Sequence, residues 1–91
     1  MDVLELKRRA CAAIDAYADT VIAFGEDILA HPELGYKEFR TSQQLRKAFE
    51  KLGMTDIDTC GITGLKAWLK KGDGPNVAVI GELDAVISPQ H

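Results

Sequence analysis

Residues 45–69, LRKAFEKLGMTDIDTCGITGLKAWL, contain the point at which the chain changes from a helical to an alternating pattern. Up to Gly53 the apolar residues recur every three or four positions, as they do on one face of a helix. After Gly53 apolar and polar residues alternate, which is typical of strands with one solvated face. Because glycine is favoured just beyond the last turn of a helix, we expect the helix to end at Gly53 and strands to follow.

The start of this helix is predicted between Glu38 and Ser42. Thr41, followed three residues later by Gln44, matches a capping box, in which a side-chain oxygen accepts a hydrogen bond from the first turn. The residues expected to share the apolar face are Ser42, Leu45, Phe49 and Leu52.

A longer helix precedes it. Asp2 and Glu5 form a second capping-box pattern, and an apolar stripe then continues at helical spacing to about Ala30. Pro32 ends the helix, since the residue before a proline is pushed out of the helical region. The stripe consists of Leu6, Ala10, Ile14, Tyr17, Val21, Gly25 and Ile28.

Three strands are predicted after the helices. Residues 55–59 alternate weakly, residues 65–70 alternate clearly, and residues 77–80 are apolar at every position, as in a central strand covered on both faces. The turn residues at 72–75 favour a hairpin between the last two strands. The predicted fold class is α/β: a long N-terminal helix, a second helix and a strand hairpin that forms part of a mixed sheet.

Length and charge restrict the possible functions. The chain has 91 residues, 46% of them hydrophobic, and a net charge of −3, which suits one small globular domain. It has no basic stripe for nucleic acid and no apolar run long enough to span a membrane. A central strand needs a layer on each side, and two helices barely supply them, so residues 1–91 are expected to be an incomplete part of an α/β domain.

The cysteines and histidines are few. Cys11 and Cys60 lie far apart, and we interpret them as half-buried, reduced structural thiols in a cytoplasmic protein. His31 and His91 are the only histidines, so the chain cannot hold a multi-histidine zinc site by itself. His31 is expected to interact with the last carbonyls of the first helix.

Glu82 and Asp84 follow the apolar run at 77–80 and stand two residues apart, so on a strand both point to one side. Acids at the carboxyl end of a central strand lie where α/β folds place their active sites. The common alternative is that both acids are simply solvated.

Several short motifs together resemble the N-terminal segment of the zinc-dependent amidohydrolase family. This family includes aminoacylases, carboxypeptidase-type metallopeptidases and p-aminobenzoyl-glutamate hydrolases, and the likeness covers residues 15–87. The motifs are HPELGYKE at 31–38, Thr41-Ser42, Leu52-Gly53, GITGL at 61–65 and GELDA at 81–85.

The resemblance implies a larger parent enzyme, in which a zinc-peptidase-like catalytic domain is interrupted by a smaller dimerisation domain. Such enzymes hydrolyse amide bonds of N-acyl, aryl-amide or peptidic amino acids. One or two zinc or manganese ions polarise the carbonyl and activate water, with a downstream glutamate as general base. The implied partners are the rest of the parent chain, a small substrate and a second copy of the parent.

Carried over by residue, the resemblance assigns Asp84 a supporting role beside the metal. Glu82 stands where one branch has a histidine ligand, which suggests the p-aminobenzoyl-glutamate hydrolase-like branch, whose ligands begin at a later Cys-Gly-His motif. Ile87 replaces a frequent proline. No metal ligand is expected within this chain, and the 91 residues alone are expected to be inactive. The alternative function is a free-standing α/β interaction or regulatory module without catalysis.

Overall fold

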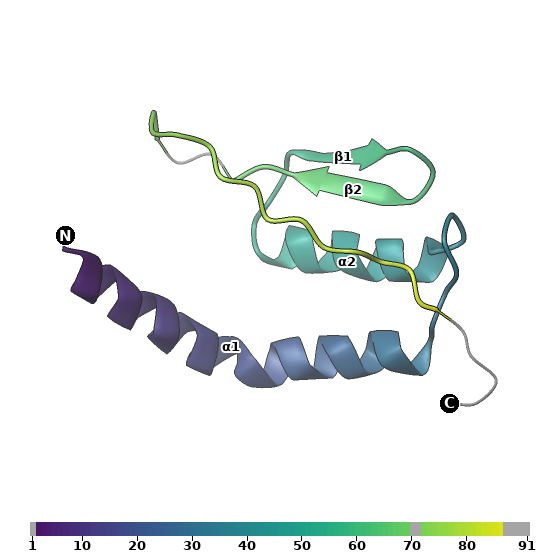
Figure 1. Cartoon of the computed structure of the whole chain (residues 1–91), viewed down its shortest axis with the longest axis horizontal. Coiled ribbons are helices and arrows are strands. Elements are labelled where there is room, and N and C mark those ends of the chain that lie inside the picture. The colour runs from purple at the N-terminus through teal and green to yellow at the C-terminus, as the bar shows by residue number, and fades with distance from the viewer. Residues whose placement is uncertain (1, 70–71, 87–91) are drawn as a thin grey trace. The chain divides into compact units, whose positions relative to one another are not determined.

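The computed structural model describes residues 2–69 and 72–86 and contains two helices and one two-stranded sheet (Figure 1). The chain divides into two compact units, Met1–His31 and Pro32–His91, which are described separately. The predicted α/β class is confirmed, because both helices precede an antiparallel hairpin. Predictions concerning Lys70, Ile87 and His91 fall outside the described residues.

The first unit consists of helix α1, Val3–Ala30. Its start is as predicted, since Asp2 Oδ1 accepts a hydrogen bond of 2.8 Å from the Glu5 amide. The Glu5 carboxylate pairs with Arg8 at 3.1 Å and Arg9 at 3.4 Å, so it acts as an ion-pair partner along the helix. None of the described residues of α1 is buried.

Helix α2, Phe39–Lys51, opens the second unit's regular structure. Its end is as predicted: Gly53 has a φ of 84°, and the Gly53 and Met54 amides donate to the Glu50 and Phe49 carbonyls at 3.0 Å each. This pattern satisfies carbonyls of the last turn, and it requires the positive φ that glycine adopts most easily.

Helix α2 begins within the predicted range of Glu38 to Ser42, but its N-terminal capping differs from the prediction. Glu38 is the N-cap residue and makes no side-chain cap, while Thr41 lies inside the first turn. The Thr41 amide donates to the Glu33 carboxylate, so the Thr41–Gln44 capping box was wrong. The first-turn amides of Arg40 and Thr41 are satisfied by Glu33, which lies seven and eight residues earlier in the chain, and the local spacing does not show this.

The sheet pairs β1, Ile57–Cys60, with β2, Gly64–Ala67, in antiparallel register from Ile57 opposite Ala67 to Cys60 opposite Gly64. Gly61, with a φ of 64°, lies in the turn between them. The hairpin therefore joins the first and second predicted strands, and the prediction that it joins the second and third was wrong. A three-residue turn brings these two strands together, whereas the second and third are separated by a longer connection.

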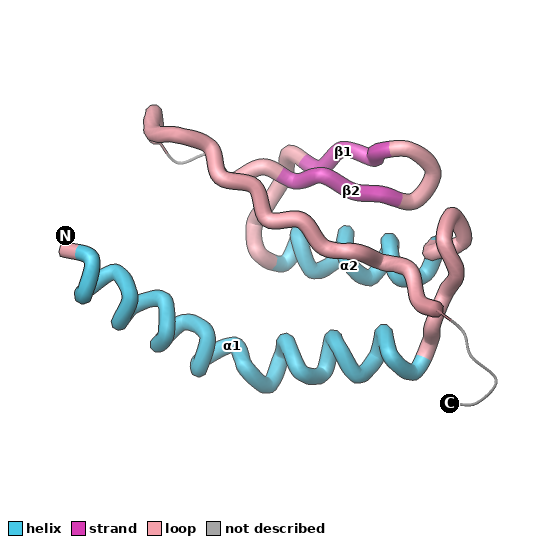
Figure 2. The backbone as a smooth tube through the Cα atoms, viewed as in Figure 1, coloured by secondary structure: helices cyan, strands magenta, loops and turns pink. Residues whose placement is uncertain are grey.

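Residues 77–80 form no strand and run as a loop in Figure 2. The prediction of a central strand was wrong for this structure. An apolar run has the composition of a buried strand, but a strand is completed by hydrogen-bonded neighbours, and within the described residues the sheet has only β1 and β2. Val79 is consequently 97% exposed.

Within the described residues the buried side chains are polar: Glu38, Thr41 and Thr63. No hydrophobic side chain in that part of the chain is buried, although β2 lies against α2. Leu65 and Ala67 are half-buried, as the alternation predicts. Cys11 and Cys60 are free thiols, but both are exposed, so the prediction of half-buried cysteines was wrong: the residues that the structure describes form no apolar core to cover them.

Among the described residues, neither α1 nor α2 is both long enough and apolar enough to cross a membrane.

Candidate functional site

A surface cavity of about 420 Å³ lies in the second unit, where three segments meet. These are the loop before α2, the turn between β1 and β2, and the segment that follows residue 80. The residues that line it are Gly35, Tyr36, Glu38, Cys60, Gly61, Ile62, Thr63, Gly64 and Asp84. The described residues of its lining include two carboxylates and no basic side chain, and these carboxylates disfavour the anionic end of a ligand.

Glu38 holds the hairpin turn at this cavity. Its side chain is only 8% exposed, and its Oε2 accepts a hydrogen bond of 2.9 Å from the hydroxyl of buried Thr63. Its Oε1 accepts one of 2.9 Å from the Lys37 amide. Both carboxylate oxygens are thus occupied, which makes Glu38 a structural anchor of the turn.

Glu33 holds the beginning of α2. Its Oε1 accepts from the Thr41 amide at 2.6 Å and from the Thr41 hydroxyl at 2.7 Å, and its Oε2 accepts from the Arg40 amide at 3.1 Å. The Thr41 hydroxyl and amide, with the Arg40 amide and charge, hold the pKa of Glu33 below its ordinary value, against the opposing effect of desolvation. A negative charge at this position also complements the positive end of the helix dipole.

Asp84 reaches the cavity from the far end of the chain. The neighbouring Ala85 amide donates to the backbone carbonyl of Glu33 at 2.7 Å, which ties this segment to the loop before α2. Among the described residues, the exposed Asp84 carboxylate has no hydrogen-bond or ionic partner. It is therefore the lining acid that remains available to an incoming group.

The predicted pair is not brought together here. Asp84 lines the cavity, whereas Glu82, which is also exposed, is not among the lining residues. The expectation that both carboxylates share one side depended on a strand, and residues 81–86 form none. Of the two acids, only Asp84 lies at the cavity, where its carboxylate can contact a bound ligand.

His31 has the structural role that the sequence predicts. Its Nδ1 lies 2.9 Å from the Asp27 carbonyl oxygen and 3.7 Å from Asp27 Oδ1. A carbonyl oxygen only accepts, so Nδ1 carries the hydrogen in this contact. His31 thus caps the last turn of α1, and its backbone amide adds a bond of 3.1 Å to the Ile28 carbonyl.

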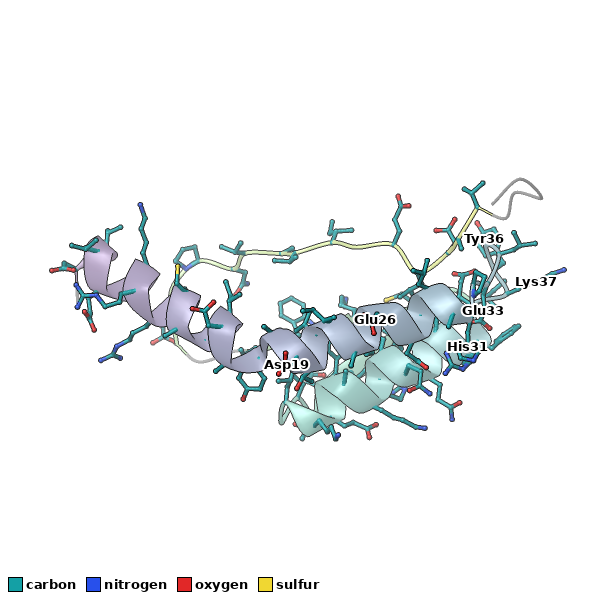
Figure 3. The ribbon with its side chains drawn as sticks, turned by 90° about the horizontal axis from the view of Figure 1, so that it is seen from below. Asp19, Glu26, His31, Glu33, Tyr36 and Lys37 are labelled. Carbon is teal, nitrogen blue, oxygen red and sulfur yellow. The ribbon has the colours of Figure 1, made fainter. Side chains whose placement is uncertain are left out.

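Tyr36 is the lining residue with an unusual backbone. Its φ is 64°, in the left-handed region that non-glycine residues seldom occupy. It lies on the loop that also carries Glu33 and Lys37, all three labelled in Figure 3. The Lys37 amide donates to the Leu34 carbonyl at 3.0 Å and closes the turn around Tyr36.

A second cavity, of about 440 Å³, is lined mainly by apolar side chains. Among the described residues that line it, none has a titratable side chain. Its lining residues are Phe49, Met54, Ala67, Trp68, Leu69, Pro75, Asn76, Val77 and Val79.

The described residues do not form a metal site. No group of three or more histidine, cysteine, aspartate or glutamate side chains in this part of the chain is arranged to hold a metal ion. A bound zinc needs three or four such ligands, so these residues do not fit the ion that the resemblance implies.

Sequence reasoning missed Glu33, Glu38 and Tyr36 as residues that shape the cavity. Local capping patterns relate residues three apart, whereas Glu33 caps from seven and eight residues away. The positive φ of Tyr36 has no signature in its side chain. The only available signal was the density of turn residues around Gly35.

Comparison with known proteins finds similarity to plant hydrolases. IAA-amino acid hydrolase ILR1-like 4 of Arabidopsis thaliana is 31% identical over 70 residues, which cover 77% of this chain and 16% of that protein. ILR1-like 6 of the same plant is 34% identical over 56 residues, covering 62% and 12% respectively. ILR1-like 2 is 32% identical over 68 residues, covering 75% and 16%.

The chain thus spans at most 16% of the length of these relatives. No family model matches it, and no solved structure matches it significantly. The distant homologues of this chain are IAA-amino acid hydrolases.

Proposed function

We propose that this chain is part of a metal-dependent amidohydrolase or peptidase that hydrolyses amide bonds of N-acyl, aryl-amide or peptidic amino acids. The observation that carries the proposal is the similarity to IAA-amino acid hydrolases over 70 residues, or 77% of the chain. IAA-amino acids are therefore the first substrates to test, beside N-acetyl amino acids and p-aminobenzoyl-glutamate. Zinc or manganese, a homodimeric parent and a cytoplasmic location belong to the same proposal.

Asp84 is the residue of this chain to which the proposal gives a functional role. It lines the cavity, and its carboxylate has no partner among the described residues. A carboxylate in this position can accept a hydrogen bond from a metal-binding imidazole and so hold that ring in place. The metal ligands themselves belong, in this proposal, to the remainder of the parent enzyme.

The first test replaces Asp84 in the parent enzyme. Asp84→Asn keeps the size of the side chain but removes its charge, so it orients a metal-binding group poorly. We expect a loss of about 10- to 100-fold in kcat/KM or in metal affinity. Steady-state hydrolysis of the three substrate types and metal analysis of the purified variant measure this loss.

Glu82→Gln is the matched control, because Glu82 is a nearby acid that does not line the cavity. It is expected to leave kcat/KM within about twofold, as for a surface substitution. Unchanged turnover of Asp84→Asn at full metal occupancy would remove the assigned role. Hydrolase activity from the isolated 91-residue chain would contradict the proposal that the ligands lie elsewhere.

A further inference from the structure

We propose that Glu33 is a positioning residue that fixes Asp84 at the cavity by coupling it to the N-terminus of α2. The role of Asp84 in hydrolysis rests on the function proposed above, but the coupling itself is a property of the fold. The side chain of Glu33 binds α2, and its backbone binds the residue next to Asp84.

The side-chain half of this coupling is strong for a half-buried acid. Three hydrogen bonds, of 2.6, 2.7 and 3.1 Å, join the Glu33 carboxylate to Thr41 and Arg40. Thr41 is 1% exposed, so its hydroxyl and amide are shielded from water that would compete for them. The charged acceptor strengthens each bond. Glu33 is therefore held against the first turn of α2.

The backbone of Glu33 makes the other half of the coupling. The Glu33 carbonyl accepts from the Ala85 amide at 2.7 Å. In the described part of residues 72–86, this is the one backbone hydrogen bond to another segment of the unit. A residue whose side chain is fixed has little freedom to move its carbonyl, so the Ala85 amide, and Asp84 beside it, are held by the same anchor.

The two glutamates of the loop before α2, Glu33 and Glu38, hold opposite sides of the cavity. Glu38 holds the hairpin turn through Thr63, and Glu33 holds the segment that carries Asp84. Both glutamates lie in the short loop that leads directly into α2, so α2 fixes the end of this loop. The opening between Asp84 and the hairpin turn is thus set by groups that do not themselves offer a free carboxylate to a ligand.

Glu33→Gln tests the coupling without changing the size of the side chain. The Gln amide has a single acceptor oxygen, so one of its groups must face an N–H donor of Arg40 or Thr41. We expect the Ala85 amide to exchange about tenfold faster with solvent in the parent enzyme, measured by hydrogen exchange and mass spectrometry. Glu50→Gln makes the same change on an exposed position of α2 and is expected to leave this rate unchanged.

Exchange of the Leu52 amide and a second variant, Thr41→Val, separate a loss of the coupling from unfolding of α2. The Leu52 amide bonds to the Ala48 carbonyl at the other end of α2 and reports whether the helix remains folded. If Glu33→Gln also deprotects Leu52, the milder Thr41→Val replaces it, because it removes only the hydroxyl bond to Glu33. Thr41→Val is expected to accelerate Ala85 exchange by a smaller factor. Unchanged Ala85 exchange in a folded variant would overturn the coupling.

A kinetic arm in the parent enzyme connects the coupling to Asp84. Glu33→Gln is expected to lower kcat about tenfold, with KM within about twofold. In the Asp84→Asn background the same change is expected to cost less than about twofold, because the residue it positions is already lost. Fully additive losses would show that Glu33 does not act through Asp84. A parent without hydrolase activity would refute the proposed function and leave amide exchange to decide the coupling.

Discussion

At the scale of one residue, Tyr36 gives the cavity loop an unfavourable backbone conformation. It occupies the third position of the turn from Leu34 to Lys37, with a φ of 64°. Positive φ at this turn position favours glycine or asparagine, and another residue there costs about 1 kcal/mol. The side chain is 75% exposed, so little packing compensates for this cost.

Replacing Tyr36 by Asn is therefore expected to stabilise the turn. Asn tolerates the left-handed region without the larger entropy cost of glycine. A gain of about 1 kcal/mol corresponds to roughly fivefold slower exchange of the Lys37 amide, which donates within this turn. Tyr36→Val, with a β-branched side chain, is the opposing variant and is expected to accelerate exchange. Equal rates in all three proteins would show that the turn is unstrained.

At the scale of elements, predictions succeed where the deciding contact is local. Asp2 caps α1 through the amide three residues away, and Gly53 ends α2 within its last turn, so both boundaries are visible in the sequence. The capping of the first turn of α2 depends on Glu33, and the pairing of residues 77–80 depends on neighbouring strands. Both are contacts between segments, which periodicity does not encode.

The same distinction applies to the candidate site. Asp84 was predicted from its position after an apolar run and from the family resemblance, and the structure places it on the cavity. Its relation to Glu33 joins residues far apart in the chain through a backbone bond, which is independent of side-chain type. A pattern of residue types in the sequence therefore cannot predict this contact between Glu33 and Ala85.

The start of α2 is expected to depend on pH. The pKa of Glu33 is lower in the folded chain than its ordinary value of 4.5, because Thr41 and Arg40 stabilise the carboxylate. Its stabilising effect is therefore complete above about pH 4.5 and is lost as the pH falls through the lower, folded value. Protection factors of the Arg40 and Thr41 amides, corrected for intrinsic exchange, are expected to fall over that range.

Two variants make this prediction specific. Glu33→Gln has no titrating group at this position, so its Arg40 and Thr41 protection is expected to be lower at neutral pH and flat across the acidic range. Glu50→Gln is expected to follow the unmodified protein. A profile in Glu33→Gln that still falls with pH would assign the dependence to another acid.

At the scale of the whole molecule, the side chains that are buried in the described residues make polar contacts between segments, and none of them is hydrophobic. The buried residues of the described chain are Glu38, Thr41 and Thr63, all joined to the loop before α2 or to the hairpin turn. Large apolar side chains remain exposed on both helices and in the loops, with Ile80 91% and Val86 90% exposed in the last segment. Exposed apolar surface of this extent marks an interaction site or a tendency to associate.

The isolated 91-residue chain is therefore expected to bind a hydrophobic dye, to self-associate in sedimentation experiments and to unfold without a sharp thermal transition. Val79→Lys places a charge in the most exposed apolar run and is expected to reduce association, whereas Asp73→Asn, a polar change at an exposed turn, is not. A monodisperse chain that unfolds cooperatively would instead favour a self-sufficient interaction or regulatory module. An apolar run such as 77–80 can be buried by pairing with a neighbouring strand, so we expect this run to form the contact between copies. If Val79→Lys leaves association unchanged, the contact lies elsewhere, and the apolar stripe of α1 is the next surface to test.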